Sequence, residues 1–106
     1  MKQLLVLRHA KSSWKDIGLR DFDRPLNKRG KNDAPRIGQL LVVQDLSPDQ
    51  IITSGATRAR LTAEAVASTC GYDAEILATE ALYMAMPGDY IGVLNQVQDS
   101  NTVVLV

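Results

Sequence analysis

Four short apolar runs divide the chain, and each is bounded by polar or turn-forming residues. The first, Leu4 to Leu7, lies within a predicted strand over residues 2–7 and is typical of a strand covered on both faces. The others predict strands at residues 50–54, 74–77 and 102–106. Runs of this length, rich in Val, Ile and Leu, favour the interior of a parallel sheet.

Segments with helical spacing lie between these runs. Asn27 is a suitable N-cap for a helix that extends to Gln44. Pro35 lies inside this segment, so the helix either begins near Asp33 or is distorted in its first turns.

Two further helices are predicted downstream. Ser54-Gly55 supplies a cap for an alanine-rich helix that stops at Gly71, and a third helix is expected at about residues 89–98. Strands that alternate with helices predict an α/β fold, with a mostly parallel sheet flanked by helices that make right-handed crossovers. In such sheets, the loops beyond the carboxyl ends of the strands form the ligand crevice.

Residues 11–26, KSSWKDIGLRDFDRPL, are dense in charge and show no sustained period. Gly18 and Pro25 lie within them, and the segment predicts a long ordered loop. Loops of this length in a small domain tend to be functional or mobile.

Composition narrows the classes of protein that the chain can represent. At 106 residues, it is long enough for one domain, residues 1–106, with a single modest core. Twelve basic residues balance twelve acidic ones, so no overall field favours nucleic acid or an anionic membrane surface. Cys70 is the single cysteine, which excludes an internal disulfide and predicts a packed helical residue in a reducing compartment. The N-terminal apolar run is too short for a signal peptide or a membrane span, so we expect a cytoplasmic protein.

Polar groups suited to phosphate chemistry follow two of the predicted strands. Arg8 and His9 come directly after the first strand, and Arg58 lies in the first helical turn after the second. If the two strands are parallel neighbours, these three side chains lie on one rim of the sheet. A guanidinium presents a rigid fork of donors that matches phosphate oxygens, and a helix N-terminus adds unpaired N–H groups. The sequence therefore predicts an oxyanion pocket that contains a histidine.

His9 is the only histidine of the chain, and it has two interpretations. A lone histidine beside a strand can simply cap a loop. Alternatively, a neutral imidazole can accept a phosphoryl group on one nitrogen while a partner holds the other, with Arg8 and Arg58 stabilising the equatorial oxygens. Each arginine can also do no more than pair with a carboxylate. Arg60 is expected to be solvated or ion-paired, and Lys11 is left open between site and surface.

Three segments carry a resemblance to a known family: LVLRHAKSSW, DFDRPLNKRG and SGATRARLTAEA. They resemble the histidine phosphatase superfamily and, within it, the small SixA-type phosphohistidine phosphatases. The resemblance spans essentially the whole chain and implies a phosphoglycerate mutase-like α/β fold. It implies that His9 is the phosphate-accepting nucleophile and that Arg8 and Arg58 bind the phosphoryl group. By the same resemblance, three residues line or support the site: Ser12, Arg24 and Leu26.

Other loop residues have open roles. Arg24 can equally be an ion-pair partner of Asp21 or Asp23. Glu80, beyond the third strand, is the best-placed carboxylate for a general acid, with Asp23 second, and it can also be an exposed loop residue. Trp14 either covers the pocket edge or anchors the loop by burial. Packing beneath the loop after Glu80, rather than contact with substrate, is expected for Tyr83, Met84 and Met86.

The chain departs from the family pattern at its end. The resemblance implies a second catalytic histidine soon after the final strand, in a motif similar to G-H-N-P, whereas the sequence ends at Val106. The fold is therefore expected to be truncated at its C-terminus. The chain is then either a fragment of a longer protein or a reduced, inactive member.

Together these features favour a phosphatase that needs no metal or cofactor and acts through a phosphohistidine at His9. The resemblance implies phosphohistidine in a protein as substrate, and the lack of a large insertion over the site suits a bulky partner. Small phosphoesters such as sugar phosphates are the alternative substrate class. A module that holds phosphate or another oxyanion without turnover is the alternative class of function, because the second histidine is absent.

Overall fold

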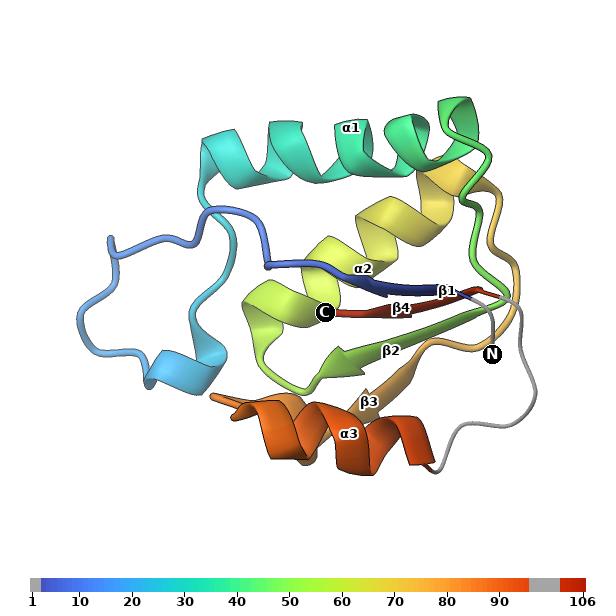
Figure 1. Ribbon diagram of the computed structural model, residues 1–106. Helices are drawn as coiled ribbons and strands as arrows, with labels where there is room; N and C mark the ends of the chain where they lie inside the picture. Colours follow the sequence, from blue (N-terminus) through green and yellow to red (C-terminus); the bar gives the residue numbers. More distant parts are fainter. Residues whose placement is uncertain (1–2, 96–101) are drawn as a thin grey trace.

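The sheet is parallel throughout the part of the chain that the structure describes. The computed structural model describes residues 3–95 and 102–106. Within them, the strands follow the order β1-β4-β2-β3 and every neighbouring pair is parallel (Figure 1). The strands are β1 (Gln3–Val6), β2 (Gln50–Ser54), β3 (Leu77–Thr79) and β4 (Thr102–Leu105). The predicted α/β fold with a parallel sheet is confirmed.

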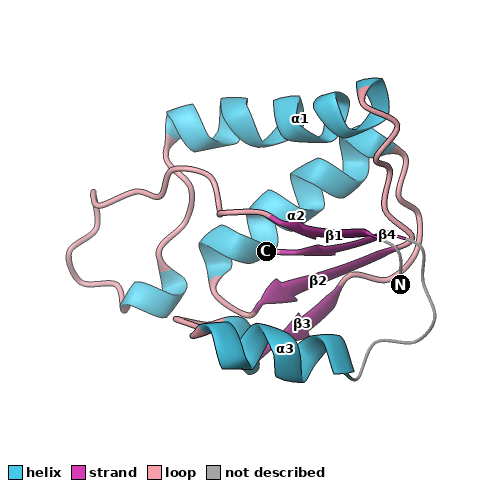
Figure 2. Cartoon of the chain, in the orientation of Figure 1, coloured by secondary structure: helices cyan, strands magenta, loops and turns pink. Residues whose placement is uncertain are grey.

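Helices cover both faces of this sheet. Helices α1 (Lys28–Val43) and α2 (Thr57–Cys70) lie on one face, and α3 (Pro87–Asn95) lies on the other (Figure 2). Two 3-10 helices, η1 (Asp21–Asp23) and η2 (Glu80–Leu82), lie in the connecting loops. No helix among the described residues is both long enough and apolar enough to cross a membrane.

Adjacent residues of β2 supply the cores on the two faces. Ile51 packs with alanines of α2, whereas Ile52 packs with Leu82 and Val93 on the α3 side. Successive side chains of a strand point to opposite faces, so a continuous apolar run is what a strand covered on both sides requires.

The strand order corrects the expectation that the first two strands are neighbours. β4 lies between β1 and β2, and the residue after it, Val106, exchanges backbone hydrogen bonds with β2: Ser54 N donates to Val106 O and Val106 N donates to Ile52 O, each at 3.0 Å. The ends of β1 and β2 still reach one rim, because all the strands run in the same direction.

The expectation that the first strand is covered on both faces is wrong. Val6 is 62% exposed and Leu4 is also exposed, whereas Leu5 packs toward α1 and α2. β1 lies at the edge of the sheet, and α3 packs on the cluster around Ile52 instead of on β1. The predicted start of the strand at residue 2 lies outside the described residues.

The helix starts are set by local hydrogen bonds. α1 begins at Lys28, not near Asp33, because the Asn27 side chain accepts a hydrogen bond from Gly30 N at 2.8 Å. α2 is capped at Ala56 rather than at Ser54-Gly55, and the Ser54 hydroxyl accepts from Ala56 N at 3.1 Å.

Downstream boundaries agree in part with the predictions. Gly71 ends α2 with a φ of 80°, as predicted, and Cys70 before it is buried in the helix. β3 lies later than residues 74–77, because its pairing partner is the C-terminal half of β2. α3 begins earlier than predicted, at Pro87, a residue suited to the first turn of a helix. Its predicted end at Gln98 lies outside the described residues.

Candidate active site

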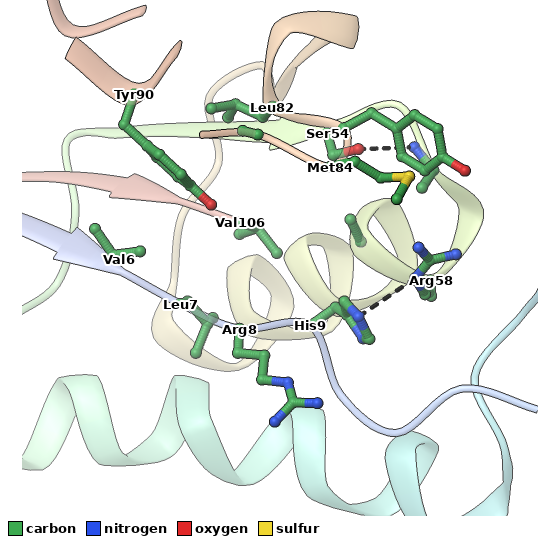
Figure 3. Close-up of a pocket in the computed structure, with 14 residues that line it drawn as sticks. Val6, Leu7, Arg8, His9, Ser54, Arg58, Leu82, Met84, Tyr90 and Val106 are labelled. Carbon is green, nitrogen blue, oxygen red and sulfur yellow. Dashed lines mark hydrogen bonds between the residues drawn. The ribbon is translucent and has the colours of Figure 1, made fainter. Parts of the chain in front are cut away.

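His9 and Arg58 meet at the rim of the sheet. His9 follows β1, Arg58 lies in the first turn of α2, and Arg58 Nε donates to His9 Nε2 at 3.3 Å (Figure 3). His9 Nδ1 lies 2.8 Å from the carbonyl oxygen of Ala10. Because a carbonyl only accepts, the ring hydrogen belongs on Nδ1, and Nε2 presents its lone pair to Arg58. The imidazole and the guanidinium therefore point toward each other and do not lie in separate regions.

One threonine of α2 fixes the backbone beside His9. The Thr62 hydroxyl accepts from Ala10 N at 3.0 Å and donates to the carbonyl of Arg58 at 2.7 Å. Thr62 is fully buried, so these bonds lie away from competing water. The strand end and the helix start therefore hold each other in register.

Asp21 holds the Arg58 guanidinium in place. Arg58 donates from Nη1 to the backbone carbonyl of Asp21 at 2.6 Å and from Nη2 to its carboxylate at 3.0 Å. Arg58 is only 8% exposed, and a buried cation needs such partners. Arg58 is therefore ion-paired with Asp21, as one expectation had it. It also lies beside His9, which is compatible with the expectation of a site residue.

The Asp21 carboxylate also connects the two loops around the site. It accepts from the Tyr83 hydroxyl at 2.6 Å and from Arg24 at 3.0 and 3.2 Å. The Tyr83 hydrogen bond, followed by that of Arg24, lowers the pKa of Asp21 to about 2, and the same bond raises the pKa of Tyr83. Sequence reasoning considered Asp21 only as a partner of Arg24 and missed its contact with Arg58. Its position 37 residues before Arg58 gave no local signal.

Arg24 is buried and supports the loop that carries Ser12. Its Nη1 donates to the Ser12 hydroxyl at 2.8 Å, and its guanidinium lies 3.4 Å from the centre of the Trp14 ring. Its carboxylate partner is Asp21, whereas Asp23 pairs with Arg20. Trp14 is 72% exposed, which excludes the alternative that it anchors the loop by burial.

The β-bridge at the base of this loop joins Ser12 to Leu26. The two residues pair in antiparallel fashion, and Leu26 is buried. The same two segments are joined by a backbone bond from Ser13 N to Pro25 O at 2.7 Å. The predicted long loop is therefore closed at its ends, and buried Leu26 is joined to Ser12, which lines the α1-side cleft.

Two clefts open on either side of His9. The α3-side cleft has a volume of about 440 Å³ and the α1-side cleft about 560 Å³, and both are lined by Arg8, His9 and Arg58. The α3-side cleft is otherwise mainly apolar or aromatic, with a wall formed by Val6, Leu82, Tyr83, Met84, Tyr90 and Val106 (Figure 3). The α1-side cleft is lined by Lys11, Ser12, Trp14, Arg24, Arg29 and Asp33.

Residues after η2 lie only in part as predicted. Met84 is 80% exposed and lines the α3-side cleft, so the expectation that it packs beneath the loop is wrong. Tyr83 lines the same cleft but is partly buried and packs against the core cluster around Ile51, as expected. Met86 is also exposed. Met84 follows the η2 turn and has a positive φ of 49°.

Glu80 and Asp23 lie outside both clefts. Glu80 begins η2 and is exposed, and neither residue is among those that line the two cavities. Asp33 is the carboxylate that lines the α1-side cleft. Within residues 3–95 and 102–106, no group of three or more His, Cys, Asp and Glu is placed to hold a metal ion.

Comparison with known proteins identifies the class to which this fold and site belong. The model of the histidine phosphatase superfamily (branch 1) matches residues 4–98. The chain therefore belongs to this superfamily, and the resemblance of its three motifs is confirmed.

Individual relatives refine this placement. A structure from Agrobacterium tumefaciens, assigned as the phosphohistidine phosphatase SixA, has a TM-score of 0.89 and 32% identity, over 99% of this chain and 68% of that one. The protein histidine phosphatase SixA complexed with tungstate has the same fold, with a TM-score of 0.79 at 20% identity over 97% of this chain and 67% of that one. The uncharacterized protein Rv1276c of Mycobacterium tuberculosis is 43% identical over 100 residues, 94% of this chain. The chain spans 60% of the length of that relative.

Proposed function

We propose that the protein is a phosphatase that transfers a phosphoryl group from its substrate to His9 Nε2. The observation that supports this proposal is the 3.3 Å contact between Arg58 Nε and His9 Nε2. A nucleophilic nitrogen and a fork of cationic donors then lie at one point, and phosphoryl transfer depends mainly on such positioning and charge stabilisation.

In this mechanism, the bond from His9 Nδ1–H to Ala10 O keeps the lone pair on Nε2. Nε2 attacks phosphorus, a P–N bond forms, and the bond from phosphorus to the leaving group breaks. Arg58 exchanges its contact with Nε2 for a phosphoryl oxygen, and Arg8 stabilises the charge from the other side. Water then attacks phosphorus, inorganic phosphate is released, and the lone pair returns to Nε2.

Phosphohistidine in a protein is the substrate that we propose first. The similarity to the Agrobacterium protein assigned as SixA supports it. A leaving imidazole needs little help from a general acid, and neither Glu80 nor Asp23 lines a cleft. A small phosphoester is the second candidate, and its alkoxide leaving group makes a stronger demand for such an acid.

Hydrolysis by single variants tests the proposal. Phosphohistidine and phenyl phosphate are incubated with the protein, and release of inorganic phosphate is measured. His9→Ala is expected to lose activity by at least about 1,000-fold, and Arg58→Ala by about 100-fold or more. Arg60→Ala is the matched control, because Arg60 is an exposed residue of the same helix whose side chain, among the described residues, bonds only to the Gly55 carbonyl.

Two other results would contradict turnover. Tungstate raises the midpoint of thermal unfolding if it binds the native state. An increase with tungstate, without any release of phosphate, would mean that the site is a binding module. No increase at millimolar tungstate would mean that the two residues do not form an oxyanion site.

A further inference from the structure

The α1-side cleft contains more positive charge than the proposed reaction uses. Its charged lining consists of Arg8, Lys11, Arg24, Arg29, Arg58 and Asp33. The chain as a whole balances twelve basic residues with twelve acidic ones, so this excess of cations is local. A cation cluster that faces a cavity favours anions over neutral molecules.

Ion pairs inside the protein neutralise only part of this charge. The Asp21 carboxylate holds Arg24 and Arg58, each at 3.0 Å. Asp33 lies 3.5 Å from Arg29 and 3.7 Å from Arg36, a residue that does not line the cleft. The carboxylates of Asp21 and Asp33 are therefore already paired with arginines.

Arg8 and Lys11 are left with their charges free. Among the described residues, neither side chain has a hydrogen-bond or ion-pair partner, and both are exposed. Figure 3 shows that the Arg8 side chain extends toward α1, away from the apolar wall. In the proposed reaction, a phosphoryl group at His9 Nε2 gives Arg8 a partner. Lys11, two residues after His9, is left without one.

The backbone that carries Lys11 is held rigidly against α1. Asn27 N donates to the Lys11 carbonyl at 2.9 Å. The first turn of α1 approaches so closely that a Cβ at Gly30 would overlap this carbonyl oxygen. The opposite wall is braced by the stacking of Arg24 on Trp14. An anion in this cleft therefore meets a preformed wall and not a free loop.

We propose that the α1-side cleft binds a second anionic group of the substrate, next to the phosphoryl group that reacts with His9. This inference rests on the proposed phosphatase function and specifies its substrate class. The second group is a carboxylate or a phosphate, carried either by a small phosphorylated molecule or by an acidic residue that flanks a phosphorylated histidine in a protein. Lys11 contacts it directly, and Arg29 adds attraction from the start of α1.

Two pairs of probes distinguish these sources. Phenyl phosphate is compared with 4-carboxyphenyl phosphate, and a phosphohistidine peptide flanked by alanines is compared with one flanked by aspartates. The wild-type protein is expected to prefer the extra carboxylate in at least one pair, measured as a ratio of kcat/KM values. Preference in the first pair identifies a small substrate that carries a second anionic group, and preference confined to the second identifies an acidic peptide.

Lys11→Gln is expected to reduce this ratio by up to about fivefold, the effect of one exposed charge pair. Lys11→Arg, which keeps the charge, is expected to retain most of the ratio, and added salt should reduce it in the wild type. Arg36→Gln is the matched control, because Arg36 is an exposed cation of α1 that pairs with Asp33 and does not line the cleft. A ratio near one for both pairs, or an unchanged ratio in Lys11→Gln, would overturn the inference.

Binding separates this inference from the proposed reaction. Trp14 is the only tryptophan and lines the cleft, so its fluorescence reports occupancy by the same four probes in the absence of turnover. If no probe is hydrolysed but the acidic members bind more tightly and Lys11→Gln removes the difference, the proposed function fails and the anion subsite stands. Equal binding of acidic and neutral members would contradict the subsite whether or not hydrolysis occurs.

Discussion

The two clefts beside His9 share three residues but differ in chemistry and in stiffness. The α1-side cleft is cationic, and its walls are connected by hydrogen bonds through Asp21, Arg24 and the cap of α1. Apart from the three shared residues, the α3-side cleft is lined mostly by apolar and aromatic side chains, and Met84 among them is 80% exposed. Methionine adapts its shape to what it contacts, whereas fixed donors do not. Under the function and the subsite proposed above, we expect the α1 side to select and orient the anion and the α3 side to accommodate the rest of the substrate.

The largest effect is expected from Gly30→Ala, which acts on the rigid side. The added methyl group would overlap the Lys11 backbone carbonyl, and no rotamer change can relieve contact with a backbone atom. We expect the free energy of unfolding to fall by about 2–3 kcal/mol, since the overpacking cost exceeds the gain in helix propensity. Urea denaturation followed by circular dichroism measures this change.

Gly92→Ala provides the matched control on the α3 side. A Cβ at Gly92, in the middle of α3, has no neighbour within 4 Å among the described residues. The substitution is expected to stabilise the protein by about 0.5–1 kcal/mol through helix propensity alone. Equal effects of the two substitutions would mean that α1 is not packed tightly against the loop at Lys11.

The second effect concerns the anchor of Arg58. Asp21→Asn removes the charge that holds Arg58 and Arg24, so we expect kcat/KM for phosphohistidine to fall by about tenfold or more. The stability loss is smaller, about 1–2 kcal/mol, because the Asp21 side chain is 44% exposed and partly screened. Asp23→Asn lies on the same turn, but within the described part of the chain Asp23 pairs only with exposed Arg20, so this substitution should change little. Comparable losses in the two variants would argue against a positioning role for Asp21.

The pH dependence of stability provides an independent measurement of this anchor. The pKa of Asp21 is lowered to about 2 from its ordinary 3.8, with the Tyr83 hydroxyl as the main cause. A carboxyl whose pKa is lower in the folded state stabilises that state above its unfolded pKa, and this stabilisation is lost as the pH falls through the folded value. The stability difference between wild type and Asp21→Asn should therefore be complete above about pH 4 and decline toward pH 2. A difference that stays constant over this range would contradict the lowered pKa.

Sequence patterns predicted the ordered loop of residues 11–26 on the α1 side of the site. The family resemblance placed Ser12 and Arg24 in the site, and Lys11 was left open between site and surface. The residues around Lys11, Ser12 and Arg24 belong to one loop and are joined to the helix capped by Asn27, so their motif is local. The parallel sheet and the bounds of β2 also follow from local apolar runs. Short-range patterns suffice where the chain folds back on itself within about thirty residues.

Contacts between residues far apart in the sequence could not be predicted from local patterns. The position of β4 between β1 and β2 depends on where α3 returns the chain, and no residue of β1 indicates it. The exposed face of Val6 follows from that order, because β1 is an edge strand. Similarly, the contact from Tyr83 to Asp21 joins residues 62 positions apart. A hydroxyl and a carboxylate carry no signal of such pairing.

The third effect separates the ring of Tyr83 from its hydroxyl. Tyr83→Phe removes the hydrogen bond to Asp21 but keeps the ring, which meets Phe22 edge to face at 5.0 Å. Because both arginines remain on Asp21, we expect kcat/KM to fall by only about two- to threefold. The pKa of Tyr83 is raised by Asp21, so its contribution to stability is present at neutral pH and is lost as the pH rises above 10. A loss as large as that in Asp21→Asn would mean that the hydroxyl, and not the carboxylate, positions Arg58.

The smallest effect is expected on the apolar wall, and it tests whether the two clefts act separately. Met84→Gln keeps the length of an exposed side chain, so the free energy of unfolding should change by less than about 0.5 kcal/mol. A polar amide on the α3 side disfavours an apolar residue that flanks the phosphohistidine, and KM for the alanine-flanked peptide should rise by about twofold. The preference for the aspartate-flanked peptide over the alanine-flanked one should stay the same, because that ratio depends on Lys11 in the other cleft. An equal change of this ratio in Met84→Gln and in Lys11→Gln would mean that the two cavities form one continuous binding surface. The contrast between a cationic and an apolar side would then not determine how the substrate binds.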